Sequence, residues 1–391
     1  MSNRLIKSVK LNGYKSIKDI DIKLEGGLNL IIGKNSVGKS NFLDFFHKIL
    51  TINLDDIANF DSEILFSDDS RFEIEKSFTL EKNESKSFTT SSKIEINFND
   101  KFFDRSITFK EFITDSDNLP FQVIKVCHGL PSNKLFISDD VYFKHSKSDF
   151  DEDFFKIMRD PSVTSFTKNL LLFVYREMTY ITNLEDKNFK SYLANKIEDV
   201  LYDLNLNIKN LTSIEEIRVN KGFDIYTDAN SISIKNLKLE YKVDGVWLDF
   251  DHLSDGTKRV FYIVSEVLSS LDTTTIIFTP YGFQEALSVF NRTIVLIEEP
   301  EIGLHPKQFN SLLQFLKDES ETKQILFTTH SPLSLNIVGY KDLDKIIIFR
   351  KDNNKTIAAN LSDQEKMKIN QFKQDSGLYL SDYWLFTNTD F

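Results

Sequence analysis

The sequence has 391 residues, a formal net charge of −11 at pH 7 and one cysteine, Cys127. A single cysteine excludes a disulfide framework and fits a reducing compartment, so we expect a cytoplasmic protein. No run of about 18 apolar residues is present to span a membrane, and the first residues predict a strand rather than a leader. The acidic balance argues against strong nonspecific nucleic-acid binding over the whole surface, although it does not exclude a local basic groove.

A glycine-rich segment near the N-terminus is the most informative feature of the chain. Leu28–Ile32 is an apolar run that predicts a short buried strand, and apolar residues at helical spacing (Phe42, Phe45, Phe46 and Ile49) predict a helix soon after it. Between them, residues 33–40 fit the phosphate-loop pattern G-x-x-x-x-G-K-[ST]. The candidate nucleotide-binding residues are Gly33, Lys34, Asn35, Ser36, Val37, Gly38, Lys39, Ser40 and Asn41.

This arrangement of strand, loop and helix start matches the chemistry of a nucleotide's phosphates. Backbone N–H groups of the loop and the positive end of the helix dipole face the anion. Lys39 can reach the β and γ phosphates, and the Ser40 hydroxyl can occupy one position on Mg²⁺. The sequence therefore predicts a site for a nucleoside triphosphate and Mg²⁺.

Residues 56–245 lie between the phosphate loop and the next candidate segment. They lack the sustained heptads that predict a coiled coil. Within them, residues 71–76 and 93–98 predict strands, residues 165–181 and 189–204 predict helices, and residues 149–153 are acidic and turn-rich. Asp244-Gly245 predicts a hairpin turn between residues 237–243 and 247–250. The lysines in or just before the second helix (Lys187, Lys190 and Lys196) are expected on a solvated face. We expect a compact α+β insertion that serves for recognition or docking.

Another candidate segment for function begins at Leu253. Ser254 is a natural N-cap and Gly256 allows a close backbone approach, while a wide apolar stripe follows from Val260 to Leu271. A capped helix alone would explain the pattern equally well, since capping signals are common.

Two further apolar runs end in polar residues. Residues 294–297 precede Glu298, Glu299 and Pro300, which predicts a central strand with two carboxylates at its carboxyl end. Glu298 is then placed to hold Mg²⁺ and Glu299 to polarise the attacking water, whereas Glu301 fits an exposed acidic loop. Residues 324–329 predict a second such strand, and His330 follows its end. This position at a strand end, after the acidic pair, favours a γ-phosphate contact for His330 over a structural role.

Together these segments resemble the ATP-binding-cassette (ABC) ATPase superfamily, and more narrowly its soluble SMC, RecF and overcoming-lysogeny-defect (OLD) branch. The residues that carry the resemblance are 33–40 (P-loop), 253–258 (signature), 294–299 (Walker B), 301–306 (D-loop place) and His330, with the turn at 12–17. The resemblance implies an α/β fold: an ABC-type ATPase head, a P-loop NTPase with a mixed or parallel sheet flanked by helices, and an α+β insertion. It divides the chain into 1–55, the insertion 56–245, and 246–391.

The resemblance also implies a mechanism. Two heads of this superfamily sandwich two ATP molecules, so Ser254 and Gly256 would contact the γ-phosphate held by the other head. Glu299 and His330 would then act as catalytic residues, and Glu298 with Ser40 would hold Mg²⁺. Three departures stand out: Ser36-Val37 replaces the more frequent Gly-Ser, Glu298 replaces the usual aspartate, and Gln122 is either the Q-loop glutamine or a surface amide.

OLD nucleases carry a Toprim nuclease domain after the switch histidine, and only 61 residues follow His330 here. Residues 345–349 predict a strand of the ATPase sheet, and residues 342–344 fit a loop better than a metal site, so we expect no nuclease in this chain.

The first hypothesis is an ATP-hydrolysing head that dimerises or forms a larger homo-oligomer and gates a separate effector, such as a nuclease or toxin, in bacterial defence. The second is a RecF- or SMC-like ATPase that binds DNA in repair. A subunit of a membrane transporter is disfavoured, and no structural metal is expected.

Overall fold

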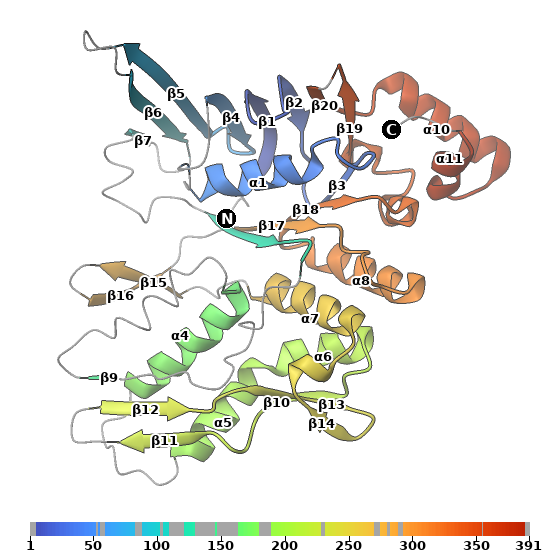
Figure 1. Ribbon diagram of the computed structural model, residues 1–391. Helices are drawn as coiled ribbons and strands as arrows, with labels where there is room; N and C mark the ends of the chain where they lie inside the picture. Colours follow the sequence, from blue (N-terminus) through green and yellow to red (C-terminus); the bar gives the residue numbers. More distant parts are fainter. Residues whose placement is uncertain are drawn as a thin grey trace. The chain divides into compact units, whose positions relative to one another are not determined.

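The computed structural model describes residues 5–51, 54, 59–82, 88–101, 105–108, 121–129, 145–146, 163–179, 189–227, 231–269, 274–279, 282–287, 292–353 and 355–387. The chain forms two compact units, each assembled from separate segments (Figure 1). Unit 1 comprises Met1–Lys125, Val289–Glu301 and Phe309–Phe391, and unit 2 comprises Val126–Ser288 and Ile302–Gln308.

The core of unit 1 is a six-stranded mixed sheet with the order β20-β19-β3-β18-β17-β8. Strands β19, β3, β18 and β17 run parallel to one another, and β20 is antiparallel to β19. Every residue of β3 and β18 is buried, as expected for parallel strands that are covered on both faces. The predicted α/β class with a mixed sheet is confirmed. The strands are β3 (Leu28–Ile32), β8 (Phe121–Val126), β17 (Arg292–Glu298), β18 (Gln324–Thr329), β19 (Ile346–Asp352) and β20 (Lys355–Asn360).

Helix α1 (Lys39–Leu50) packs between this core sheet and a second, antiparallel sheet of unit 1. The side chains of Phe42, Phe45 and Phe46 are fully buried in one hydrophobic cluster to which both sheets contribute. Figure 1 shows α1 on one side of the core sheet and α8 (Pro306–Glu319) on the other. The second sheet has the order β2-β1-β4-β5-β6-β7, with β1 (Ile6–Asn12), β2 (Ile20–Lys23), β4 (Phe60–Phe66), β5 (Arg71–Lys82), β6 (Phe88–Asp100) and β7 (Arg105–Thr108).

The remaining helices of unit 1 follow β18 along the chain. Residue Ser362 caps α10 in a capping box with Glu365, which fixes where that helix begins. Residues 342–344, predicted as a loop, enter a 3-10 turn in which Asp344 pairs with Lys366. These elements are η2 (Pro332–Ser334), α9 (Leu335–Val338), η3 (Leu343–Lys345), α10 (Asp363–Ser376) and α11 (Leu380–Phe386).

Unit 2 is built around helix α7 (Asp255–Leu268), whose ten buried residues include Glu266. The carboxylate of Glu266 accepts hydrogen bonds from the backbone N–H groups of Ser165 and Phe166, which satisfies two donors at the start of α4. The other elements of unit 2 are β9 (His145–Ser146), α4 (Ser165–Thr179), α5 (Phe189–Val200), α6 (Tyr202–Leu211), β10 (Glu216–Val219), β11 (Asp224–Thr227), β12 (Ser231–Lys235), β13 (Leu239–Val243), β14 (Val246–Leu248), η1 (Phe250–His252), β15 (Thr274–Thr279) and β16 (Gly282–Leu287).

The predicted elements of the 56–245 interval are mostly confirmed. The β13–β14 hairpin turns through Asp244 (φ 50°) and Gly245 (φ 76°), and the left-handed conformation at both residues suits the pair. The single helix predicted over 189–204 is wrong: two helices, α5 and α6, meet at Leu201, and Val200 is exposed instead of lying on the apolar face. The acidic segment 149–153 and Lys187 lie outside the described residues, and the role of the interval stays a prediction.

Candidate nucleotide site

Three of the predicted segments converge at one edge of the core sheet of unit 1. Strand β3 pairs with β18 and β18 pairs with β17, all in parallel, so their carboxyl ends meet at the same edge. The register places Ile32 opposite Thr329, and Thr328 opposite Glu298. The loops that follow these strands carry the P-loop, His330 and Glu299.

The P-loop is held by backbone geometry that requires glycine at two positions. A Cβ on Gly33 would lie 2.3 Å from the carbonyl oxygen of Phe349, and one on Gly38 (φ 104°) would lie 2.5 Å from the Thr356 hydroxyl. Ser36 adopts a φ of 64°, the left-handed region that favours glycine, at the position where the resemblance stated above led us to expect glycine. Strands β19 and β20 therefore shape the loop from positions more than 300 residues away in the sequence.

Lys39 lies at the start of α1 and folds over the loop. Its Nζ donates hydrogen bonds to the carbonyl oxygens of Gly33 (2.7 Å) and Lys34 (3.0 Å). The same Nζ lies 3.1 Å from Nε2 and 3.3 Å from Nδ1 of His330. Burial lowers the pKa of Lys39 to about 8, although the carboxylates of Glu299 and Glu301 act in the opposite direction. Lys39 and His330, which are 291 positions apart in the sequence, therefore belong to one site.

Glu299 and His330 are in direct polar contact at this edge of the sheet. The distance from Glu299 Oε1 to His330 Nε2 is 2.6 Å. The backbone of Glu299 has a φ of 44°, and its N–H donates to the carbonyl oxygen of Thr328 at 3.0 Å. A left-handed non-glycine residue stores about 1–3 kcal/mol of backbone strain, which is common at functional positions. The two residues predicted to be catalytic are thus in contact, at a strained turn.

Glu298 lies at the end of β17, and its side chain is only 11% exposed. Mg²⁺ usually takes one or two carboxylates and completes its shell with phosphate oxygens and water. In the part of the chain that the structure describes, no three His, Cys, Asp or Glu side chains gather as metal ligands. The carboxylate of Glu298 and the hydroxyl of the exposed residue Ser40 are oxygen ligands of the kind that Mg²⁺ takes when it is shared with a nucleotide, and their assignment to the metal stays a prediction.

The remaining loop residues differ in exposure. Lys34, Asn35 and Ser36 are exposed, and Val37 is buried beneath them. The amide oxygen of Asn41 accepts a hydrogen bond from Lys15 Nζ at 3.4 Å.

The predicted signature residues belong to unit 2. Ser254 is the N-cap of α7, and its hydroxyl accepts a hydrogen bond from the N–H of Thr257 at 3.2 Å, as the sequence predicted. A Cβ on Gly256 would lie 2.8 Å from the carbonyl oxygen of Gly303, so glycine is needed for this close approach. The contact of Ser254 and Gly256 with a γ-phosphate of another head stays a prediction.

Sequence reasoning missed the role of Glu301, which it assigned to an exposed acidic loop. Its Oε1 accepts hydrogen bonds from the Thr329 hydroxyl (2.7 Å), the His330 N–H (2.7 Å) and the Ser331 N–H (3.2 Å). Its Oε2 is buried and has no hydrogen-bond partner among the described residues. Glu301 therefore fixes the backbone that carries His330, and only the three-dimensional fold reveals this.

Replacing Glu301 with alanine is expected to lower the rate of the ATP hydrolysis that the sequence predicts by up to about 100-fold, the scale of a misplaced catalytic group. Three donors lose their acceptor, so the backbone at His330 shifts while the P-loop stays intact. The Glu301→Gln variant keeps one acceptor oxygen and should lose less. Steady-state hydrolysis and the affinity for a fluorescent ATP analogue would be measured together, and wild-type turnover in both variants would contradict this role.

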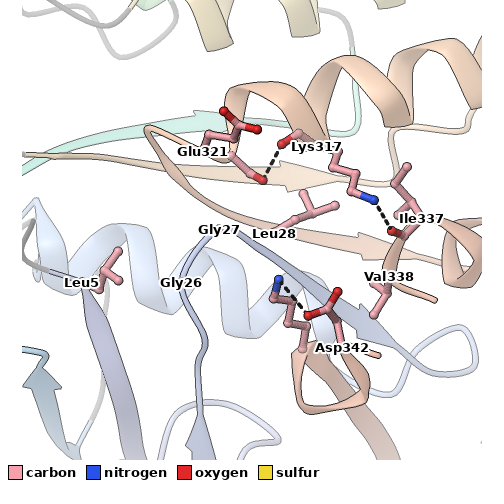
Figure 2. A pocket seen from close by; sticks show the side chains of 11 residues that line it. Leu5, Gly26, Gly27, Leu28, Lys317, Glu321, Ile337, Val338 and Asp342 are labelled. Carbon is pink, nitrogen blue, oxygen red and sulfur yellow. Dashed lines mark hydrogen bonds and ion pairs between the residues drawn. The ribbon is translucent and has the colours of Figure 1, made fainter. Parts of the chain in front are cut away.

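Two cavities of unit 1 differ in their relation to these residues. One of about 270 Å³ is lined by Gly33, Lys34 and His330 together with Trp384 of α11. The other, of about 340 Å³, lies where β3 begins, at the edge opposite the P-loop (Figure 2). Its lining residues Lys317, Asp342 and Lys345 include none of the predicted site residues. The first cavity is therefore the one that adjoins the candidate site.

The Q-loop glutamine could not be placed from the sequence. Gln122 lies in β8, at the edge of the core sheet next to β17, and its side chain is outside what the structure describes. The choice between a Q-loop residue and a surface amide stays open.

Comparison with known proteins identifies the family. Residues 28–336 match the protein family described as "AAA domain, putative AbiEii toxin, Type IV TA system". The chain belongs to this AAA family. The match runs from β3 through the P-loop, Glu298, Glu299 and His330, so the family includes all three loops of the candidate site. An AAA ATPase domain is a nucleotide-binding domain, and the predicted P-loop ATPase class is confirmed.

The individual relatives and solved structures share little sequence identity with this chain. The chain is 22% identical over 355 residues to Septu protein PtuA of Bacillus thuringiensis, covering 87% of this chain and 75% of that protein. An SMC head domain from Thermotoga maritima superposes with a TM-score of 0.42 and 11% identity, covering 91% of this chain and 99% of that one. An Smc head domain with an extended coiled coil, bound to the C-terminal domain of ScpA from Pyrococcus furiosus, gives a TM-score of 0.46 and 13% identity, covering 95% and 100%. None of the described helices combines the length and apolar character needed to cross a membrane.

Proposed function

We propose that this chain binds ATP with Mg²⁺, hydrolyses it, and uses the nucleotide to control its assembly. The contact between Glu299 and His330 beside the Lys39 ammonium carries the proposal. It brings together a general base (Glu299), a γ-phosphate contact (His330) and a phosphate-binding cation (Lys39) in one site. Phosphates would lie along the backbone of residues 33–38, with Lys39 turned toward them. Glu298 and Ser40 would hold Mg²⁺, which neutralises charge on the β and γ phosphates.

In the proposed reaction Glu299 orients and polarises the attacking water, and His330 contacts the γ-phosphate. Glu301 holds the backbone of His330 in place. Since a water must be aligned with the γ-phosphate, the strained turn at Glu299 serves to aim its carboxylate along that line.

The proposed assembly is a homodimer, or a larger homo-oligomer, in which two heads enclose two ATP molecules. Ser254 and Gly256 of one head would contact the γ-phosphate bound by the other. Moving such an equilibrium from 1:99 to 99:1 requires about 5.5 kcal/mol of differential binding. A few charge-assisted phosphate contacts at about 1.5–3 kcal/mol each can supply this, so the nucleotide state can set the assembly state.

The biological role that we propose is the gating of a separate effector protein, such as a nuclease or toxin, in bacterial antiviral defence or a toxin-type system. The family description, which names a toxin–antitoxin system, supports a role of this kind. The net charge of −11 weighs against a head that binds DNA through its general surface.

A pull-down of tagged Glu299→Gln protein from its native host, with Mg²⁺ and ATP, tests this role. Protein and nucleic acid recovered with the bait would both be identified, and Lys39→Ala would serve as the control that does not bind nucleotide. A stoichiometric protein partner that is lost in the control supports effector gating. DNA recovered without such a partner would overturn it in favour of a DNA-binding repair ATPase.

A further inference from the structure

A lysine that the sequence did not single out lies beside the proposed metal ligand. Lys125 is near the end of β8, and its side chain is only 14% exposed. Its Nζ is 3.2 Å from Asp44 Oδ1, on α1, and 3.8 Å from Glu298 Oε1, at the end of β17. An ammonium group is therefore held between a helix carboxylate and the carboxylate that we assign to Mg²⁺.

Asp44 is built to remain an anion and to hold cations. Burial would raise its pKa, but the hydrogen bonds from Tyr14 (2.8 Å) and Lys125 and the nearby ammonium groups hold the pKa of Asp44 well below its usual range. Lys15 and Lys48 also approach it, at 3.3 Å and 3.6 Å. Asp44 therefore offers the Lys125 ammonium a second, permanently charged partner.

Mg²⁺ and this ammonium group would compete for the same oxygen atoms. A bound Mg²⁺ lies about 2.0–2.1 Å from a ligand oxygen, and its double charge repels an ammonium that is only a few ångströms away. The ammonium must then leave Glu298 and move fully to Asp44. We propose that Lys125 is a resident counter-cation of Glu298 that Mg²⁺ displaces, and that Asp44 takes up the displaced ammonium. This inference rests on the proposed role of Glu298 in the nucleotide site.

The two ends of this ion pair have opposite predicted effects. Removing the ammonium with Lys125→Met takes away a cation that competes with the metal for Glu298, so half-maximal binding of the analogue should require less Mg²⁺. Removing its other partner with Asp44→Asn leaves the ammonium on Glu298 alone, so more Mg²⁺ should be required. A role limited to holding β8 against α1 would not produce effects of opposite sign, because both changes break the same contact.

The experiment titrates Mg²⁺ into the full chain with a fluorescent, non-hydrolysable ATP analogue and records the Mg²⁺ concentration at half-maximal binding. The midpoint is expected to fall about tenfold in Lys125→Met and to rise by a similar factor in Asp44→Asn, the scale of a partly screened charge pair. Lys125→Arg keeps the positive charge and should stay near wild type. Lys48→Met is the matched control, since Lys48 contacts the same Asp44 from α1.

Several outcomes would overturn the inference. One is an unchanged midpoint in Lys125→Met, and another is a shift of equal size in Lys48→Met. A third is weaker binding of the analogue by Lys125→Met at saturating Mg²⁺, since this would make Lys125 a phosphate ligand instead. Thermal unfolding of each variant identifies any that fail to fold; if Asp44→Asn is one of them, the comparison of Lys125→Met with Lys125→Arg decides.

Failure of the inference is distinguishable from failure of the proposed function. If wild-type protein does not bind the analogue, or binds it without regard to Mg²⁺, the proposed function fails at the level of nucleotide or metal. If wild-type binding depends on Mg²⁺ and the Lys125 variants leave the midpoint unchanged, the site stands and only the displacement by Mg²⁺ is wrong.

Discussion

Lys39→Ala is expected to weaken ATP binding by 100-fold or more and to abolish measurable hydrolysis. The Lys39 side chain is buried and contacts the P-loop backbone, and charge-assisted contacts to phosphate contribute about 1.5–3 kcal/mol each. Loss of two such contacts corresponds to at least about a 100-fold change in dissociation constant. Equilibrium binding of a fluorescent ATP analogue and phosphate release would both be measured.

The control for this variant is Lys317→Ala. Lys317 lines the cavity at the edge of the sheet opposite the P-loop, so its loss should leave nucleotide binding unchanged (Figure 2). Binding of the analogue by Lys39→Ala with wild-type affinity would show that residues 33–40 do not hold phosphates in this chain.

Glu299→Gln is expected to retain ATP while hydrolysis falls by about 10²–10⁴-fold, the usual cost of losing a general base. Glutamine has nearly the same shape and can still contact His330, so the turn at residue 299 should persist. Because hydrolysis no longer removes the γ-phosphate, the closed dimer should accumulate with ATP. Single-turnover kinetics and light scattering would follow the two effects separately.

Lys39→Ala is the matched control for the dimer, since it should remain monomeric with ATP. A Glu299→Gln protein that binds ATP but stays monomeric would contradict the ATP-sandwich assembly for this chain alone. A variant that hydrolyses ATP at the wild-type rate would instead show that another group activates the water.

Much of this site could be predicted from local sequence. The strand, loop and helix around Lys39 are contiguous, and the apolar runs before Glu298 and His330 are short patterns that predict buried strands. Parallel pairing then brings the ends of those strands together without further information. For the same reason the Ser254 cap and the Asp244-Gly245 turn were predictable, since each depends on a few neighbouring residues.

The contacts that were missed depend on distant parts of the chain. Glu301 acts on the backbone of residues 330 and 331, nearly 30 positions later, and a carboxylate in an acidic sequence gives no local sign of such a partner. Lys125 meets Asp44 and Glu298 only because β8 lies next to β17 at the edge of the sheet. The boundary at Leu201 was missed because the apolar spacing continues across it.

The strand order of the core sheet has a consequence for protein synthesis. β3 lies between β18 and β19, so residues 28–32 acquire both neighbours only after about 300 further residues have been made. At translation rates of 5–20 residues per second this takes roughly 15–60 seconds, during which the apolar strand and the P-loop lack their supports. Ribosome-bound chains should therefore need chaperones over this interval. Incomplete products should be unable to bind ATP, so the cell would not accumulate active fragments.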